Sequence, residues 1–553
     1  MMKRNGIFKV VLLTILIAIV CTWIFKAPTL TANGLVDGDR AQLGIFTISQ
    51  YVEILFQYFF HIILIVVSMG AFYGVAYKIP AYRQLLDMLV EKARGKEEIV
   101  LGAIMAIIAI IVSVTGLQLG IMFVFPFVIS LVVLMGYNKL VAASVTVGST
   151  IVGLIGTTLG TSTTYYIDAV LGTNYATEMI SKVALLVLAL AVLIFNVIVY
   201  ARKTRNETDK VLAYVPFKNG LPEEEVTAVK VKKTNIFSKI LTKKKTVKKE
   251  ENKKENKKTV KKEAPKKETK KTVKPTAKKK APAKKSTKTR ANNAATTAVK
   301  VVRGTGNAKI WPFIVVFDLT LLIMILSVFD WSLFDMTWAS DALKSIKEFE
   351  VGEFPIFGKI LGNVNAFGQW SIRYEIPVLM FVSSGILALI YKVKFDDFID
   401  GVLEGMKKTL VPALTMILAY LVLIICVEDA FQLHFVRFFL ELNKGLSSIG
   451  VVFTMTLSLI VGSIVNVDTL YLAQIVLSYA TTIITDTSLY PIIGVMTQGI
   501  YGLMMLIAPT SLVLIGTLSF LNIPYLQWIK HIWKVFLELL GILLVIFLIL
   551  VLI

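Results

Sequence analysis

SVTVGSTIVGLIGTTLGTSTTYY, residues 144–166, is the stretch that decides the fold of this 553-residue chain. It lies between two strongly apolar runs, yet residues 148–164 contain four glycines and eight Ser or Thr hydroxyls. A glycine inside a helix costs roughly 1 kcal/mol relative to alanine. In lipid, an irregular backbone is tolerated only where protein or a polar cavity covers it. The stretch therefore predicts either a broken helix that lines a polar cavity or a tightly packed helical seam with a Gly156–Gly160 contact.

The composition is that of a membrane protein. Apolar residues make up 56% of the chain, and the mean hydropathy is +0.72. Runs of about 18 or more apolar residues recur and predict membrane-spanning helices. The first run, residues 8–25, follows a basic start as a signal peptide would. Because no small-residue cleavage site follows it, we expect a retained first helix.

The net charge of +22 is concentrated in one segment. Residues 243–290 contain 22 Lys, one Arg and five Glu, a local charge of +18. Because this tract has almost no apolar residues to bury, it predicts a disordered linker over 206–309 between two transmembrane halves, 1–205 and 310–553. The linker is either a solvated tether or a polybasic segment that attracts anionic lipid. Binding of nucleic acid is less favoured, because the tract has no aromatic residue to stack on bases.

The distribution of basic residues predicts the orientation of the chain. These residues cluster at the N-terminus, over 78–96 and over 202–205, whereas 27–48 and 171–178 contain few of them. The positive-inside rule then places the N-terminus and the Lys-rich linker in the cytoplasm. The apolar runs of the first half predict six spans, at about 8–25, 53–77, 98–115, 120–137, 142–168 and 179–201.

A short pattern occurs in both halves. Gly74–Lys78 and Ile386–Lys392 each end an apolar run and precede an amphipathic segment. Internal duplication is common in secondary transporters, which bind substrate between the repeats. Both Tyr-Lys pairs are expected on the cytoplasmic side, so the pattern predicts a parallel repeat or one additional hairpin.

The second half contains its own interrupted segment, Ala508-Pro509-Thr510-Ser511. Proline removes a backbone donor and breaks a helix, which leaves a half-helix N-terminus whose positive end suits an anionic group. One hydroxyl-bearing interruption in each half favours the cavity over the seam for residues 144–166. Neither interruption contains Lys or Arg, so an anionic solute there would bind to hydroxyls and helix ends.

We expect the two interruptions to face each other near the middle of the membrane, with the hydroxyls of Thr158, Thr161, Thr510 and Ser511 pointing into a polar cavity. The candidate substrate-binding residues are Gly156, Thr157, Thr158, Thr161, Ser162, Thr163, Pro509, Thr510 and Ser511.

Ionisable groups inside apolar runs are functional candidates, because a charge in lipid is costly. Asn466, Asp468 and Thr469 combine amide, carboxylate and hydroxyl oxygens that suit a cation, and they form the candidate site for a coupling ion. Asp318, about two turns into another run, predicts a structural pair. The three histidines and two cysteines are scattered without metal-ligand spacing. We find no nucleophile–base pair either, so no metal site, cofactor or enzymatic activity is predicted.

Three segments carry a resemblance to a known family. They are GAFYGVAYKIPAYRQLLD at 70–87, the hydroxyl-rich stretch at 144–166, and APTSLVLIGTLSFLNIPYLQWIKHIWK at 508–534. They resemble the anaerobic C4-dicarboxylate carrier (DcuC/YfcC-like) family, which is related to the aminobenzoyl-glutamate transporters of the ion-transporter superfamily. Two segments depart from the family pattern: residues 462–466 stand where relatives carry a Gly/Ser-rich loop, and 115–120 stand where they carry an acidic segment.

The resemblance covers about 45–205 and 310–545 and excludes the linker. It implies a secondary carrier with two re-entrant hairpins, a transport domain that moves on a scaffold, and a homodimer. It further implies dicarboxylates or amino-acid-like carboxylates as substrates, with a sodium ion or a proton as the coupling ion.

The sequence thus predicts an all-α polytopic secondary transporter of the cytoplasmic (inner) membrane, for a small carboxylate or amino acid. Its fold would comprise two transmembrane halves with broken helices or re-entrant hairpins. The alternative is a membrane scaffold that transports nothing and whose basic loop recruits anionic lipid or nucleic acid.

The linker yields a first testable prediction. Deletion of residues 243–290 leaves folding and transport intact, because this tract has no apolar surface to pack. It weakens binding to anionic liposomes, most strongly at low salt, because screening is weakest there. Co-sedimentation with liposomes and thermal unfolding of the purified protein measure the two effects. Loss of the folded protein on deletion would show that the tract is structural.

Overall fold

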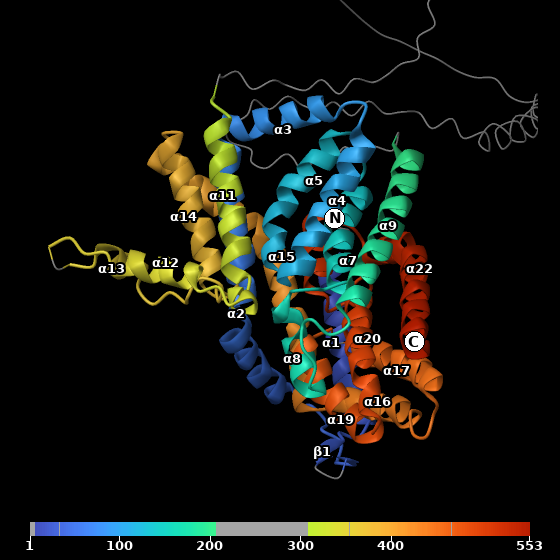
Figure 1. Ribbon diagram of the computed structural model, residues 1–553. Coiled ribbons are helices and arrows are strands. Elements are labelled where there is room, and N and C mark those ends of the chain that lie inside the picture. The colour runs from blue at the N-terminus through green and yellow to red at the C-terminus, as the bar shows by residue number, and fades with distance from the viewer. Residues whose placement is uncertain (1–5, 32–33, 206–307, 353, 466) are drawn as a thin grey trace, which may run out of the picture. The chain divides into compact units, whose positions relative to one another are not determined.

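The structure is a computed structural model, shown in Figure 1. It describes residues 6–31, 34–205, 308–352, 354–465 and 467–553. The predicted linker therefore lies outside the described residues, except for its last two positions. The two predicted transmembrane halves belong to one compact unit.

The helices and strands of the first half follow one another in this order: α1 (Gly6–Ile24), β1 (Thr29–Thr31), β2 (Gly34–Val36), α2 (Ile45–Lys78), α3 (Pro80–Ala93), α4 (Glu97–Thr115), η1 (Gly120–Val124), α5 (Phe125–Leu134), α6 (Lys139–Ala143), η2 (Ser144–Gly148), α7 (Ser149–Ile155), α8 (Thr161–Leu171) and α9 (Met179–Thr204).

The second half contains α11 (Trp311–Val328), η4 (Trp331–Phe334), α12 (Trp338–Lys347), α13 (Ile356–Leu361), α14 (Glu375–Ile390), α15 (Phe395–Glu428), α16 (Phe431–Glu441), α17 (Ser448–Ser463), α18 (Thr469–Tyr471), η5 (Leu472–Leu477), α19 (Ser478–Ile483), η6 (Thr487–Leu489), α20 (Tyr490–Met504), α21 (Leu512–Leu521) and α22 (Tyr525–Leu552).

Long apolar helices dominate the structure. Among the described residues, seven helices are long and apolar enough to cross a membrane: α1, α2, α4, α9, α11, α15 and α22. This confirms a helical, polytopic architecture of the membrane type. The two short strands β1 and β2 add one antiparallel hairpin.

The longest described helices, α2 and α15, pack antiparallel along their length. Each has 34 residues. At one end Tyr51 of α2 donates a hydrogen bond to Asp429, just beyond α15, at 3.3 Å. Towards the other end, Gly74 of α2 meets Gly401 and Gly405 of α15, backbone against backbone. Because glycines have no side chain, the two helix axes can approach closely there.

Helices α4 and α5 form a hairpin. Arg205, just beyond α9, pairs with Glu97 at the start of α4 at 3.0 Å, and its guanidinium lies 6.0 Å from the centre of the Tyr137 ring, just beyond α5. The start of α4 and the end of α5 therefore lie at the same end of the bundle, with residues 116–119 as the tip. Of the two spans predicted here, α4 is long and apolar enough to cross a membrane, whereas η1 and α5 form one of the shorter apolar helices.

Helices α17 and α19 form the corresponding hairpin in the second half. Thr454 of α17 donates a hydrogen bond to Asn443 at 2.7 Å, and Tyr479 of α19 donates one to Glu441 at 3.2 Å. Both arms are thus anchored at the end of α16. The tip of this hairpin follows Ser463.

An ion-pair network fixes the end of α16 to the β1–β2 hairpin. Arg437 of α16 pairs with Asp37, which follows β2, at 2.7 Å. The same guanidinium donates to Glu441 at 3.0 Å and holds the pKa of that carboxyl below its ordinary value.

The two halves contain the same parts in inverted orientation. Each has a long helix (α2, α15), a shorter amphipathic helix (α3, α16), a hairpin (α4–α5, α17–α19), an interrupted helix (α6–α8, α20–α21) and a final long helix (α9, α22). The equivalent helices α2 and α15 are antiparallel, and so are α9 and α22, in which Asn196 donates to Glu538 at 2.6 Å. The predicted parallel repeat is therefore wrong: Ile386–Lys392 ends α14, whereas the equivalent of α2 is α15.

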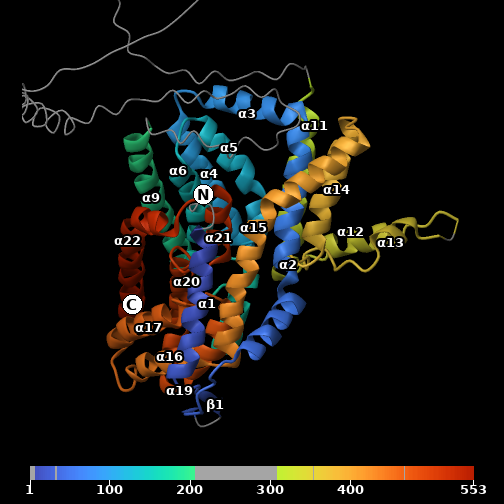
Figure 2. The same ribbon diagram turned by 180° about the vertical axis from the view of Figure 1, so that it is seen from behind.

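Residues 330–370, between α11 and α14, form an arm that projects sideways from the bundle in both views (Figures 1 and 2). The backbone N–H groups of Gly368 and Trp370 donate to the carbonyl of Ser327 at 2.9 and 3.0 Å. These bonds hold both roots of the arm at the end of α11.

The predicted structural partner of Asp318 is missing from the described part of the chain. Asp318 is an exposed residue of α11 and forms no hydrogen bond or ion pair with any described residue. Among the residues that the structure describes, this expectation is therefore wrong.

The packing of α2 on α15 yields a prediction for stability. A Cβ added at Gly74 would lie 2.9 Å from the carbonyl carbon of Gly401 and 3.0 Å from Cα of Gly405. Since backbone cannot yield as a flexible side chain does, Gly74→Ala destabilises the protein by about 1–3 kcal/mol. Gly385→Ala in α14 is the matched control, because nothing lies within 4 Å of its Cβ position. Thermal unfolding in detergent compares the two variants. Equal midpoints for Gly74→Ala and Gly385→Ala would contradict the close packing of α2 on α15.

Candidate functional site

The helix that begins the stretch 144–166 is broken, as its glycines predict. α7 ends at Ile155 and α8 begins at Thr161. Gly156, with φ −105° and ψ 42°, turns the chain out of α7. Gly160 lies against the backbone of Gly116, where an added Cβ would be 2.6 Å from the backbone nitrogen. The first interruption therefore packs directly on the tip of the first hairpin.

Hydrogen bonds from α4 hold this interruption. Thr158 donates its backbone N–H to the carbonyl of Ser113 at 2.9 Å, and the Ser113 hydroxyl donates to the carbonyl of Gly156 at 2.6 Å. The Thr158 hydroxyl also contacts Ser113, while the Thr157 hydroxyl donates to Leu154 at 2.9 Å. Both threonines are buried. Their hydroxyls are thus already engaged within the protein, which is the bonding expected of a packed seam.

Gln498 of α20 reaches the same interruption from the second half. Its amide N–H₂ donates to the carbonyl of Ile155 at 3.2 Å and to that of Thr157 at 2.9 Å. One turn further on, a Cβ added at Gly502 would lie 2.7 Å from the backbone nitrogen of Ile155. Gln498 therefore satisfies carbonyls that the broken helix leaves unpaired, and Gly502 allows α20 to approach α7 closely.

The second interruption separates α20 from α21 at Pro509. The Thr510 hydroxyl donates to the carbonyl of Val465 at 2.7 Å and so ties this interruption to the tip of the second hairpin. The indole N–H of Trp528 in α22 donates to the carbonyl of Leu506 at 2.8 Å. Each interruption thus contacts the tip of its own hairpin.

Asp468 begins α18 and lies near α20. Its Oδ1 accepts the backbone N–H of Tyr471 at 3.0 Å, the bond of a helix N-cap. On α20, the Tyr501 phenol donates to Oε1 of Gln118, at the tip of the first hairpin, at 3.1 Å. Asp468 is therefore a helix cap, and Tyr501 ties α20 to the tip of the first hairpin.

The two interruptions lie close together along α20. Gly502 contacts the first interruption, and Ala508 in the second interruption is six residues further on. α20 ends at Met504, and six residues span at most about 22 Å even when fully extended, so the two interruptions lie within that distance of each other.

Several buried hydroxyls beside the interruptions and tips have no hydrogen-bond partner within the described chain. Most buried polar groups are paired, so an unpaired one marks a place where an ion, water or solute can bind. These hydroxyls belong to Thr163, Thr164, Ser463 and Ser511.

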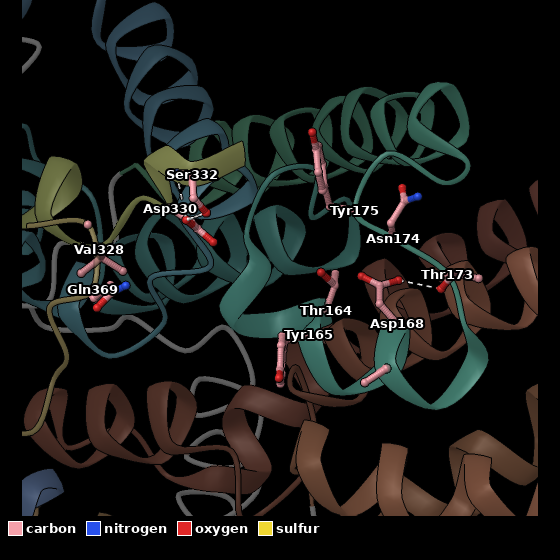
Figure 3. A pocket seen from close by; sticks show the side chains of 12 residues that line it. Thr164, Tyr165, Asp168, Thr173, Asn174, Tyr175, Val328, Asp330, Ser332 and Gln369 are labelled. Atoms are coloured by element: carbon pink, nitrogen blue, oxygen red, sulfur yellow. Dashed lines mark hydrogen bonds between the residues drawn. The ribbon is translucent and has the colours of Figure 1, made fainter. Parts of the chain in front are cut away.

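A cavity of about 610 Å³ opens beside α8 and the roots of the arm. Asp168, in the last turn of α8, accepts the Thr173 hydroxyl at 2.7 Å, and Asp330 lies at the root of the arm (Figure 3). Among the described residues, those that line the cavity include two carboxylates and no Lys or Arg: Thr164, Tyr165, Asp168, Ala169, Thr173, Asn174, Tyr175, Val328, Asp330, Ser332, Gly368 and Gln369.

A second, much smaller space adjoins this cavity, and we refer to it as the passage. Its volume is about 10 Å³, roughly one water molecule. It shares Thr164 and Asp168 with the cavity and is also lined by Lys182 and Gln498. Because Gln498 binds the first interruption, the passage is lined both by residues of the outer cavity and by a residue that holds the broken helix.

Lys182 is the residue that the sequence analysis missed. It is 4% exposed, and its ammonium donates to the carbonyl of Tyr175 at 3.0 Å. From the sequence alone, a single lysine in the first turn of an apolar helix predicts a residue at the membrane interface. Only the fold shows that it is buried.

The predicted site residues fall into three groups. Five make the contacts given above: Gly156, Thr157, Thr158, Asp468 and Thr510. Thr163 and Ser511 carry buried, unpaired hydroxyls. Of the others, Pro509 lies in the second interruption, Thr469 begins α18, only the backbone of Thr161 and Ser162 is described, and Asn466 lies outside the described residues.

No family model, curated protein or solved structure matches the chain. Within the described residues, no group of three or more His, Cys, Asp or Glu side chains could hold a metal ion.

The double hydrogen bond of Gln498 yields a prediction. Gln498→Leu leaves the carbonyls of Ile155 and Thr157 unpaired in a buried position, which costs about 1–3 kcal/mol each. We expect a lower thermal midpoint for the detergent-purified protein than with Gln527→Leu, the control at an exposed position of α22. Equal midpoints would show that Gln498 does not hold the broken helix.

Proposed function

We propose that this protein is a secondary active transporter of a small carboxylate or amino-acid-like solute, driven by a sodium or proton gradient. The observation that carries the proposal is the meeting of two interrupted helices and two hairpin tips around α20, contributed by two inverted halves. In secondary transporters, inverted repeats and discontinuous helices commonly build the binding site near the middle of the membrane. We take the α4–α5 and α17–α19 hairpins to be re-entrant in this sense.

The interruptions offer groups that bind a carboxylate. α8 and α21 both begin at an interruption, so their N-terminal N–H groups and positive dipole ends point towards it. Ser511, at the start of α21, adds a buried hydroxyl that has no partner in the described chain. A carboxylate bound there would accept bonds from N–H and O–H donors without a fixed cation.

Asp468 and Thr469 are our candidates for the coupling ion, together with Asn466. The carboxylate already caps α18 through one oxygen, and a cation would use the other. We further propose that the protein lies in the cytoplasmic membrane with its linker inside, and that it forms the homodimer the family resemblance implies.

Reconstitution into liposomes tests the transport activity. With an imposed sodium or proton gradient, the full-length protein should accumulate a labelled carboxylate or amino acid, and dissipation of the gradient should abolish accumulation. A membrane scaffold would accumulate no solute under any gradient, and that result would refute the proposal.

Ser511→Ala should raise the KM for the transported solute about tenfold, because one charge-assisted hydrogen bond is lost. Ser519→Ala, two turns along α21, is the control and should leave KM unchanged. An unaltered KM in Ser511→Ala, with normal thermal unfolding, would remove this hydroxyl from the site.

A further inference from the structure

The passage between the outer cavity and Gln498 is flanked by one acidic and one basic side chain. Asp168 is on α8 and Lys182 is near the start of α9. Both line the same water-sized space, which Thr164 also lines, and Thr164 and Asp168 line the outer cavity as well. Thr164 and Asp168 are four residues apart on one helix and therefore lie on the same face.

Lys182 is buried and has no direct ion pair among the described residues. Its ammonium donates to the backbone carbonyl of Tyr175, and the carboxylates of Asp168 and Glu178 act on its charge from beyond salt-bridge distance. A buried charge is costly unless it is paired. A carboxylate that entered the passage would give Lys182 a direct ion pair.

Asp168 keeps one carboxylate oxygen available. Oδ1 accepts the Thr173 hydroxyl, and Oδ2 has no hydrogen bond from any described residue. Figure 3 shows Asp168 beside Thr164 at the wall of the cavity. An ammonium group that arrived from the cavity could therefore bind this carboxylate.

Thr164 supplies a separate observation. Its side chain is 2% exposed and lines both the cavity and the passage, yet its hydroxyl has no partner in the described chain. It is placed to donate a hydrogen bond to a solute held between Asp168 and Lys182.

We propose that this passage selects a zwitterionic amino acid, with the ammonium group bound by Asp168 and the carboxylate bound by Lys182 and Thr164. The proposal rests on the transport function above and narrows its substrate class. A dicarboxylate would bring a second negative charge against Asp168, and a simple amine would leave Lys182 unpaired. A zwitterion satisfies both charges and adds no net charge to a buried site.

The outer cavity is suited to the entry of a zwitterion from solution. Its volume of about 610 Å³ falls in the usual range for a small-molecule site. Its two carboxylates, Asp168 and Asp330, attract the ammonium end of a zwitterion from solution. The passage itself must widen to admit the solute, so the cavity acts as the entrance and the passage as the selective step.

Matched ligands test the selectivity. Full-length protein is assayed for binding in detergent and for uptake into liposomes, with a panel of L-amino acids, succinate, and the deaminated acid and decarboxylated amine of the best amino acid. For alanine these are propionate and ethylamine. We expect an amino acid to bind and be transported, and both truncated ligands to bind about tenfold or more weakly.

Two variants that each remove one charge test which side chain binds the ammonium group of the amino acid and which binds its carboxylate. Asp168→Asn should raise the Kd and KM for the amino acid about tenfold and abolish its advantage over the deaminated acid. Lys182→Gln should abolish its advantage over the amine instead. Asp341→Asn on the arm and Lys203→Gln at the other end of α9 are exposed controls that should change neither quantity. If Lys182→Gln does not fold, Lys182→Arg should retain the preference for amino acid over amine.

Transport of succinate or propionate without competition by any amino acid would overturn this proposal and leave the transporter intact. Specific binding of an amino acid without uptake under any gradient would instead refute the transport function and support the passage. Absence of both binding and uptake for every ligand would refute both proposals.

Discussion

The structure depends on one constraint: every backbone N–H and C=O group that leaves a helix inside an apolar bundle needs another partner. The chain leaves helices at two interruptions and two hairpin tips, and specific groups meet the requirement. Ser113 and Gln498 bind the carbonyls of the first interruption, while Trp528 binds a carbonyl of the second. A backbone that needs this support can persist only where both halves surround it. The hydrogen bonds that support the interrupted helices therefore lie at the candidate site.

The antiparallel packing of α2 on α15 provides the frame for that arrangement. Gly74 and Gly405 allow two 34-residue helices to lie against each other, and each helix then leads into an amphipathic helix and a hairpin. Because the two long helices are antiparallel, the hairpins enter from opposite ends and their tips meet the interruptions from opposite sides. This inversion also brings α20 against α7, so that Gly502 touches Ile155. A parallel repeat would have placed both hairpins at one end.

The sequence reveals where the chain breaks more readily than where it turns back. Glycines and hydroxyls at 156–164 and the proline at 509 alter backbone preference locally, so both interruptions could be predicted. How α4 and α5 pack could not, because the apolar run that contains α5 resembles a full span in the sequence. The contacts that hold the two ends together join distant residues, such as Arg205 with Glu97 and with the ring of Tyr137. The burial of Lys182 is likewise a property of the fold, since nothing in its neighbouring sequence distinguishes it from an interfacial lysine.

The unpaired hydroxyls show how the fold and the proposed function are connected. A buried hydroxyl without a partner costs about 1–3 kcal/mol, so a chain optimised only for stability would replace it with an apolar group. Here such hydroxyls flank the interruptions, at Thr163, Ser463 and Ser511, and another lines the entrance at Thr164. Thr157 and Thr158, by contrast, use their hydroxyls to hold the backbone. The seam and the cavity predicted from one stretch thus involve different residues of that stretch. Thr157 and Thr158 build the break, whereas Thr163 and Thr164 retain hydrogen-bonding capacity that a bound solute would satisfy.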